Sequence, residues 1–198
     1  MTVAIMISVA IGIAAGTLWI PHTITPHMGP IITAGLCLLL FLVGISAGGQ
    51  EGLMLKLKRM GFRILLVPLM VGLGSIFGAA AGGLMLNIPL RQASAVGAGF
   101  GWYTFVGVEL TKHSAQLGAL AFMTNFSREL IALLIIPFVA KHVGFLESIG
   151  PAGATGSTVT LPIISQATDP GIAMVAFLTG MILSSLVPFL VPFIMALG

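Results

Sequence analysis

Charged residues are scarce in this chain. Asp, Glu, Lys and Arg together make up 7% of its 198 residues, whereas hydrophobic residues make up 58%. A soluble domain carries roughly 25% charged residues, so this chain has too few to cover a folded surface in water. The composition therefore excludes a soluble globular protein and predicts one that is surrounded by a lipid bilayer.

Several functional signatures are missing as well. The single cysteine, Cys37, can form no disulfide within the chain and suits a small packing residue. There is no P-loop and no H-E-x-x-H motif, so nothing indicates ATP hydrolysis or metal-dependent proteolysis. His22 and His27 lie in a Pro-rich loop without Cys or carboxylate, which argues against a metal site. We therefore predict no enzyme, no cofactor and no bound metal.

Apolar stretches long enough to cross a bilayer as helices, which takes about 20 residues, recur along the chain. They are residues 3–20, 31–47, 64–86, 117–140 and 171–197. We interpret the first as a retained helix and not a signal peptide, because no basic residues precede it. Glycines four residues apart, such as Gly78 and Gly82, favour close helix packing. The sequence thus predicts an all-α polytopic membrane protein, a helical bundle that forms a single transmembrane domain over residues 1–198.

Basic residues are concentrated in one short connection, residues 50–63. It holds half of the Lys and Arg residues of the chain, namely Lys56, Lys58, Arg59 and Arg63. The positive-inside rule places this connection in the cytoplasm, and counting back two spans places the N-terminus there too. The net charge of +3 therefore indicates the orientation of the chain in its membrane and not nucleic-acid binding.

Two apolar segments, 92–110 and 150–170, are interrupted by Gly, Pro and Thr. Irregular backbone at membrane depth is tolerated only where it is buried in protein or lines a cavity. Paired interrupted segments are typical of the substrate site of a transporter with inverted repeats. We therefore expect two broken or re-entrant segments and a secondary transporter for a small solute. Whether the two segments cross the membrane or re-enter it stays open.

A polar cluster, Asn125, Arg128 and Glu129, falls near the middle of the apolar stretch 117–140. The spacing i, i+3, i+4 places the three residues on one helix face, which must point into the bundle because ions are costly at that depth. The face either lines the transport path, with Asn125 and Glu129 binding substrate, or braces neighbouring helices. Arg128 suits bracing best, since it cannot release a proton.

Further candidates follow the glycines of residues 97–101: Trp102, Tyr103 and Thr104. On a bent backbone the aromatic rings would face a cavity and suit an amine, although interfacial belt residues have the same character. Glu109 is either a titratable ion-coupling site or an interfacial carboxylate that is solvated beside Lys112. Burial would favour its protonated form and make it a proton carrier.

Residues 153–160 (GATGSTVT) are rich in small and hydroxyl-bearing side chains. The candidate substrate ligands here are Thr155, Gly156, Ser157, Thr158 and Thr160. An opened half-helix could hold a carboxylate on its free N–H groups, which fits an amino-acid substrate. Alternatively, the hydroxyls bond back to carbonyls of their own helix.

Five motifs together resemble the bacterial lysine exporter family, LysO. They are LLLFLVGIS (38–46), GFGWYT (99–104), RELIALLIIP (128–137), GATGSTVTLP (153–162) and GMILSSLVPFLVP (180–192). The resemblance implies an inner-membrane secondary exporter of L-lysine or a related amino acid. Typical members are longer, and this chain resembles their C-terminal two-thirds. A small membrane partner subunit could therefore supply the missing helices, and a homo-oligomer is the other arrangement.

Export of cationic lysine would run against the inside-negative membrane potential, at about 2.3 kcal/mol per charge per 100 mV. Without a nucleotide site, antiport of H⁺ or Na⁺ is the expected energy source. Glu109 and Glu129 are the carboxylates expected at depth, so at least one should carry the coupling ion. The alternative function is a non-transporting membrane subunit or scaffold of a larger complex.

Overall fold

The computed structural model describes residues 11, 34, 35, 38, 41 and 62–197 of the chain. The chain divides into two compact units, Met1–Gly48 and Gly49–Gly198, and the second contains nearly all of the described residues. The predicted spans 3–20 and 31–47 and most of the basic connection 50–63 lie outside the described residues.

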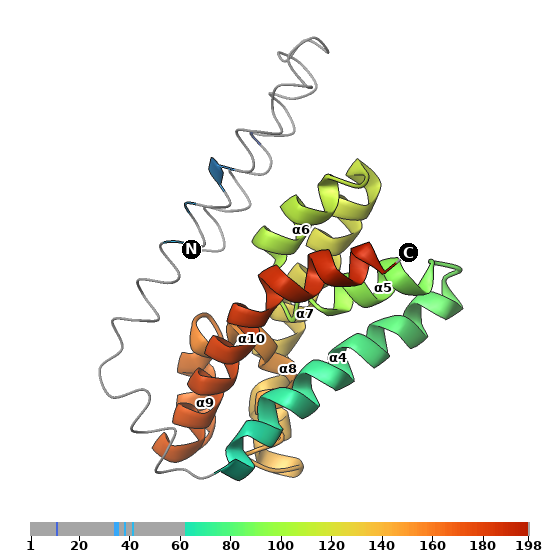
Figure 1. Ribbon diagram of the computed structural model, residues 1–198. Coiled ribbons are helices and arrows are strands. Elements are labelled where there is room, and N and C mark those ends of the chain that lie inside the picture. Colours follow the sequence, from blue (N-terminus) through green and yellow to red (C-terminus); the bar gives the residue numbers. More distant parts are fainter. Residues whose placement is uncertain (1–10, 12–33, 36–37, 39–40, 42–61, 198) are drawn as a thin grey trace. The chain divides into compact units, whose positions relative to one another are not determined.

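The described part of the second unit consists of helices joined by short connections and contains no strand. In chain order they are η2 (Phe62–Leu65), α4 (Leu66–Met85), α5 (Leu90–Gly97), α6 (Tyr103–Thr111), α7 (Ala115–His142), α8 (Ile149–Ala152), η3 (Gly153–Ser157), α9 (Leu161–Ala167) and α10 (Pro170–Ala196) (Figure 1).

Three of these helices, α4, α7 and α10, are long and apolar enough to cross a membrane. They coincide with the predicted stretches 64–86, 117–140 and 171–197 to within two residues at each end. Large apolar side chains on them point away from the unit: Phe77 is 68% exposed, Leu134 80% and Phe189 75%. Such a surface is unfavourable in water and suits lipid, so the chain is a membrane protein.

Two of the three long helices, α7 and α10, begin at side chains that satisfy their first backbone N–H groups. Ser114 accepts a hydrogen bond from the N–H of Leu117 at 3.1 Å at the start of α7. Asp169 accepts from Gly171 at 2.8 Å and from Ile172 at 3.0 Å, and Pro170 fills the first position of α10. These are the preferred residue types for helix starts, so local sequence sets both boundaries.

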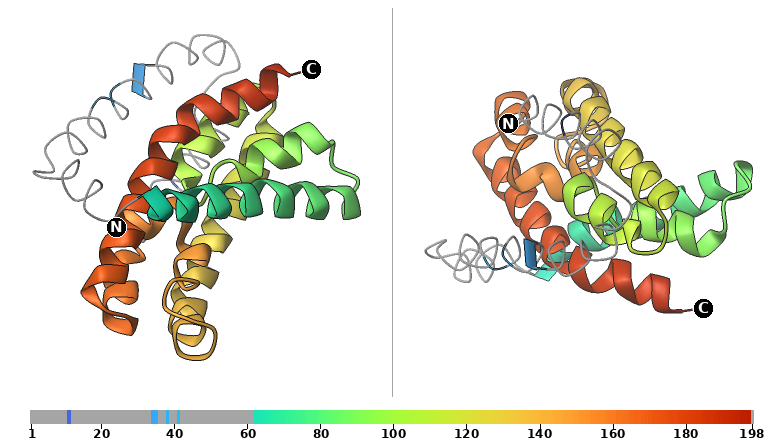
Figure 2. Two further views of the ribbon diagram at one scale, coloured as in Figure 1. Left: turned by 60° about the horizontal axis from the view of Figure 1, so that its bottom comes forward. Right: turned by 90° about the horizontal axis from the view of Figure 1, so that it is seen from above.

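The short helices lie in the two segments that Gly, Pro and Thr interrupt. Between α5 and α6 the backbone turns at Phe100 and Gly101, which have φ values of 51° and 99°. Between α8 and η3 it turns at Gly153, with φ 56°. α5 runs back along α4, α6 packs against α7, and η3 packs against α10 (Figure 2). The structure therefore supports each interrupted segment with a long helix.

Close packing of α4 on α5 depends on glycines other than the predicted pair. Gly78 and Gly82 have no atom within 4 Å of the position that a Cβ would take, whereas a Cβ at Gly97 would lie 2.5 Å from Cβ of Ala79 and 2.8 Å from the carbonyl oxygen of Ser75. Gly83 faces Ala93 in the same way. The spacing rule identified a helix suited to close packing but selected the wrong face within the second unit.

The packing predicts that Gly97→Ala is destabilising. The added methyl group meets α4 at less than 3 Å, and overpacking of this kind costs about 1–3 kcal/mol. The melting temperature of the purified protein in detergent should fall accordingly. Gly78→Ala is the matched control and should be neutral or slightly stabilising, because its Cβ enters open space and Ala favours helix. Equal melting temperatures for the two variants would contradict the prediction.

Candidate functional site

The two interrupted segments meet each other backbone to backbone. The N–H of Ala154 donates a hydrogen bond to the carbonyl oxygen of Phe100 at 2.8 Å. A Cβ at Gly153 would collide with the same oxygen, and one at Gly101 would lie 3.4 Å from Cγ2 of Thr155. At this crossing of residues 98–102 and 152–156, position 153 therefore requires glycine because of the close contact, and position 101 because of its φ of 99°.

Asn125 of α7 closes the interruption between α5 and α6. Its Oδ1 accepts from the N–H of Gly101 at 2.8 Å, and its Nδ2 donates to the carbonyls of Val96 and Ala121, both at 3.0 Å. The side chain is 2% exposed. Both amide hydrogens of this predicted substrate ligand are therefore used by backbone in this structure, and its contacts position the crossing.

Arg128 holds the second segment in a similar way. Its Nε donates to the carbonyl of Pro151 at 3.4 Å and its Nη2 to that of Gly150 at 3.3 Å. Its Nη1 donates to Oγ of Ser75 at 2.6 Å, and that hydroxyl donates to the carbonyl of Gly97 at 2.8 Å. The guanidinium therefore links α4, α7 and α8, as expected for a brace, and reaches both interruptions.

Glu129, in contrast, has a carboxyl oxygen without a hydrogen-bond partner among the described residues. It is 2% exposed, and its Oε1 has no hydrogen-bond partner among the described residues. The hydroxyl of Thr179 on α10 is a second buried polar atom without a partner in the described part of the chain. Burying an unpaired carboxylate is costly unless a proton or a cation neutralises it. Glu129 is therefore the described side chain most suited to bind a cation.

The hydroxyls of residues 153–160 bond within their own segment. Thr155 donates to the carbonyl of Ala152 at 2.8 Å, Ser157 to that of Ala154 at 3.2 Å, and Thr158 to that of Thr155 at 3.4 Å. Thr155 and Thr160 are buried with their Oγ1 atoms 3.3 Å apart. Gly156 lies against the carbonyl of Ala176 on α10. Hydroxyl bonding to nearby carbonyls, the alternative interpretation of this motif, is thus present.

The aromatic candidates pack against neighbouring rings. Tyr103 is 6% exposed, and its ring meets those of Phe122 and Phe126 edge-on at 5.3 and 5.5 Å between centroids. The half-buried Trp102 lies 5.2 Å from Phe105. Thr104 is half-buried on α6. These contacts fix α6 on α7 and place the Tyr103 ring inside an aromatic cluster.

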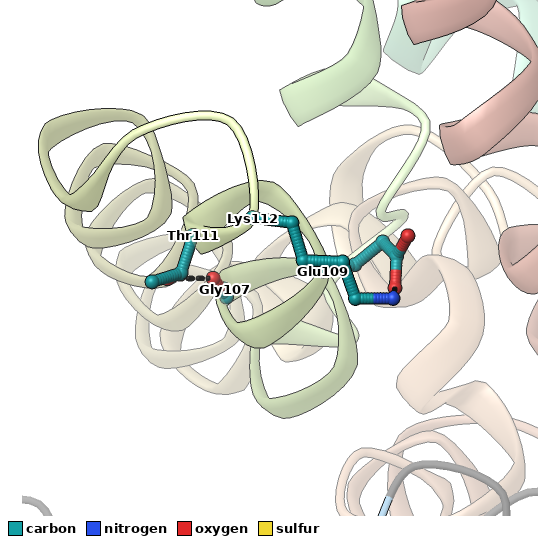
Figure 3. Close-up of polar contacts among 4 residues, drawn as sticks. All are labelled: Gly107, Glu109, Thr111 and Lys112. Atoms are coloured by element: carbon teal, nitrogen blue, oxygen red, sulfur yellow. Dashed lines mark hydrogen bonds and ion pairs between the residues drawn. The ribbon is translucent and has the colours of Figure 1, made fainter. Parts of the chain in front are cut away.

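Glu109 forms an ion pair with Lys112 near the end of α6, with Oε2 and Nζ 2.7 Å apart (Figure 3). The side chain of Lys112 is 42% exposed. In the same turn the hydroxyl of Thr111 donates to the carbonyl of Gly107 at 2.7 Å. This geometry is that of the interfacial carboxylate beside a lysine, one of the two interpretations that the sequence left open.

A groove of about 600 Å³ lies beside the crossing. Its lining consists of Met123, Thr124, Ser127, Arg128, Ile131, Ala132 and Pro151. Arg128 is the one predicted site residue in this lining, and none of residues 153–160 contributes to it. The sequence analysis did not single out Thr124 and Ser127, although with Arg128 they form a polar i, i+3, i+4 stripe on an apolar helix.

The hydrogen bonds of Asn125 predict a structural role. Asn125→Ala removes three buried hydrogen bonds and leaves the N–H of Gly101 without an acceptor, which should cost about 2–4 kcal/mol. The melting temperature in detergent should fall clearly. Ser185→Ala is the control, because it removes an exposed hydroxyl that bonds only within α10. A variant as stable as this control would show that Asn125 does not hold the crossing.

Comparison with known proteins identifies similar chains. Residues 6–195 match the profile of the family described as lysine exporter LysO. The lysine exporter LysO of Escherichia coli is 35% identical over 162 residues, which cover 81% of this chain and 54% of the E. coli protein. The putative lysine exporter of Haemophilus influenzae is 31% identical over 190 residues, 94% of each chain. No solved structure matches. The chain thus spans about half the length of the E. coli relative.

Proposed function

Because the chain belongs to the lysine exporter LysO family, a family of transporters and not of enzymes, we propose that it exports L-lysine or a related amino acid across the bacterial inner membrane. The observation that carries the proposal is Glu129. It is a buried carboxyl whose Oε1 has no hydrogen-bond partner in the part of the chain that the structure describes, one helical turn beyond the residue that holds the crossing of the two interrupted segments.

The proposed role of Glu129 is to bind a cation reversibly during transport. The ammonium groups of lysine, H⁺ and Na⁺ all neutralise a carboxylate, and only one of them can do so at a time. Exchange at one carboxyl would couple outward movement of lysine to inward movement of the ion. Glu109 is less suited to this role, because Lys112 already neutralises it. We therefore propose antiport with Glu129 as the coupling residue.

Two further features complete the proposal. The basic connection 50–63 orients the protein with its N-terminus in the cytoplasm, by the positive-inside rule. We also propose that a second chain, either a small membrane subunit or another copy of this one, contributes to the transporter. A non-transporting subunit or scaffold is the alternative function. In that case the chain would brace a partner, and no substitution in it would alter selectivity.

Glu129→Gln should abolish lysine efflux. The substitution keeps the shape and removes the charge, and loss of one member of a buried charge pair costs enough to reduce binding about tenfold or more. The measurement is efflux from preloaded bacterial cells that lack their own lysine exporters, with protein levels in the membrane matched. Glu147→Gln is the matched control, because Glu147 is exposed in the loop after α7. Normal efflux from Glu129→Gln would contradict the assignment of the site.

Antiport predicts a second result. In liposomes, exchange of external for internal labelled lysine should vary with an imposed pH or Na⁺ gradient for the unmodified protein and not for Glu129→Gln. Glu109→Gln should keep the dependence, because its ion pair lies outside the proposed site. If lysine exchange by Glu129→Gln still depended on the pH or Na⁺ gradient, another group would have to couple the ion to transport. Complete lack of lysine exchange by the unmodified protein, with and without candidate partner subunits, would favour the scaffold.

A further inference from the structure

The positive charge of Arg128 is solvated by neutral groups. Its three hydrogen bonds go to two carbonyls and a hydroxyl, and it forms no ion pair within the described residues. A guanidinium has five N–H groups, so two remain for a further acceptor. Among the described carboxylates, Glu109 is paired with Lys112, and Asp169 caps α10. Arg128 is therefore a charged donor with free capacity.

Arg128 also lines the groove of about 600 Å³. That volume lies within the roughly 300–1,000 Å³ of small-molecule sites. Thr124, one turn before Arg128, and Ser127, directly before it, line the groove as exposed side chains. Met123, Ile131 and Pro151 make the rest of the lining largely apolar. One cation, two hydroxyls and an apolar wall suit an anionic group attached to an aliphatic chain.

We propose that this groove is a subsite for the carboxylate of the amino-acid substrate, with Arg128 as its charge partner and Thr124 and Ser127 as hydroxyl donors. The inference rests on the proposed function and specifies which end of the substrate binds where. Arg128 binds the carboxylate at the groove. Glu129, the next residue on α7, is buried and does not line the groove, and it keeps the role proposed above of binding the ammonium or the coupling ion. This role is compatible with the predicted bracing role of Arg128, because bracing uses only three of its five N–H groups.

The test compares two compounds that differ only in the carboxylate. L-lysine and cadaverine, its decarboxylated form, compete with labelled L-lysine for exchange into lysine-loaded liposomes that contain the purified full chain. The test variant is Thr124→Val with Ser127→Ala, because Arg128 itself also supports the fold. Hydrogen bonds to charged groups are worth about tenfold or more in affinity. The preference of the protein for L-lysine over cadaverine should therefore fall about tenfold in the variant, while inhibition by cadaverine stays the same.

Ser185→Ala on α10 is the control and should retain the full preference for L-lysine. An unchanged preference in the Thr124/Ser127 double variant would overturn the subsite and leave the export function standing. An anionic lipid headgroup is the other source of a matching anion. Stabilisation by phosphatidylglycerol that the variant loses, with its lysine preference intact, would assign the groove to lipid and overturn the subsite too. No lysine exchange by the unmodified protein would overturn the proposed function and the subsite together.

Discussion

The rest of the second unit depends on one hydrogen-bonded crossing, where the backbone of residues 98–102 meets that of residues 152–156. Inside a membrane, irregular backbone finds no water, so each of its polar groups needs a partner from the protein. Phe100 and Ala154 supply one pair directly, and Asn125 supplies partners for Val96 and Gly101. The short helices α5, α6, α8 and η3 can therefore end inside the membrane, because the backbone groups at their ends bond to each other and to α7.

The three polar residues of the cluster on α7 contact different parts of the structure, according to their positions on the helix. Asn125 bonds the first interruption. The i, i+3, i+4 spacing predicted that Arg128 shares one inward face with Asn125 and Glu129, but Arg128 is only half-buried, bonds the second interruption and borders the groove. Glu129 returns to the buried side but finds no donor among the described residues. Most buried polar side chains of the described residues have a partner, so a buried carboxyl without one is costly, and this cost is the basis for the cation-binding role proposed for Glu129.

Within the described residues, sequence alone predicted the three long helices and the positions at which the helices are interrupted, since these follow from apolar length and from local Gly, Pro and Thr content. It also identified α7 as the helix with buried polar residues. It did not predict what those residues bond to. Two of the three partners of Asn125 lie 24 and 29 positions away in sequence, and those of Arg128 lie up to 53 away, so they depend on how the segments cross. For the same reason the spacing of Gly78 and Gly82 could not show that Gly83 and Gly97 make the contacts.

Adjacent charges of opposite sign usually suggest a neutralising pair, and Arg128 with Glu129 does not form one in the described structure. Successive residues of a helix point about 100° apart, so the two side chains enter different surroundings. A direct ion pair would have satisfied both charges and left nothing for a zwitterion to bind. Separation keeps a positive and a negative group available at the same depth on one rigid helix. An amino acid carries both signs itself, so the proposed substrate can pair with both groups only because Arg128 and Glu129 do not neutralise each other.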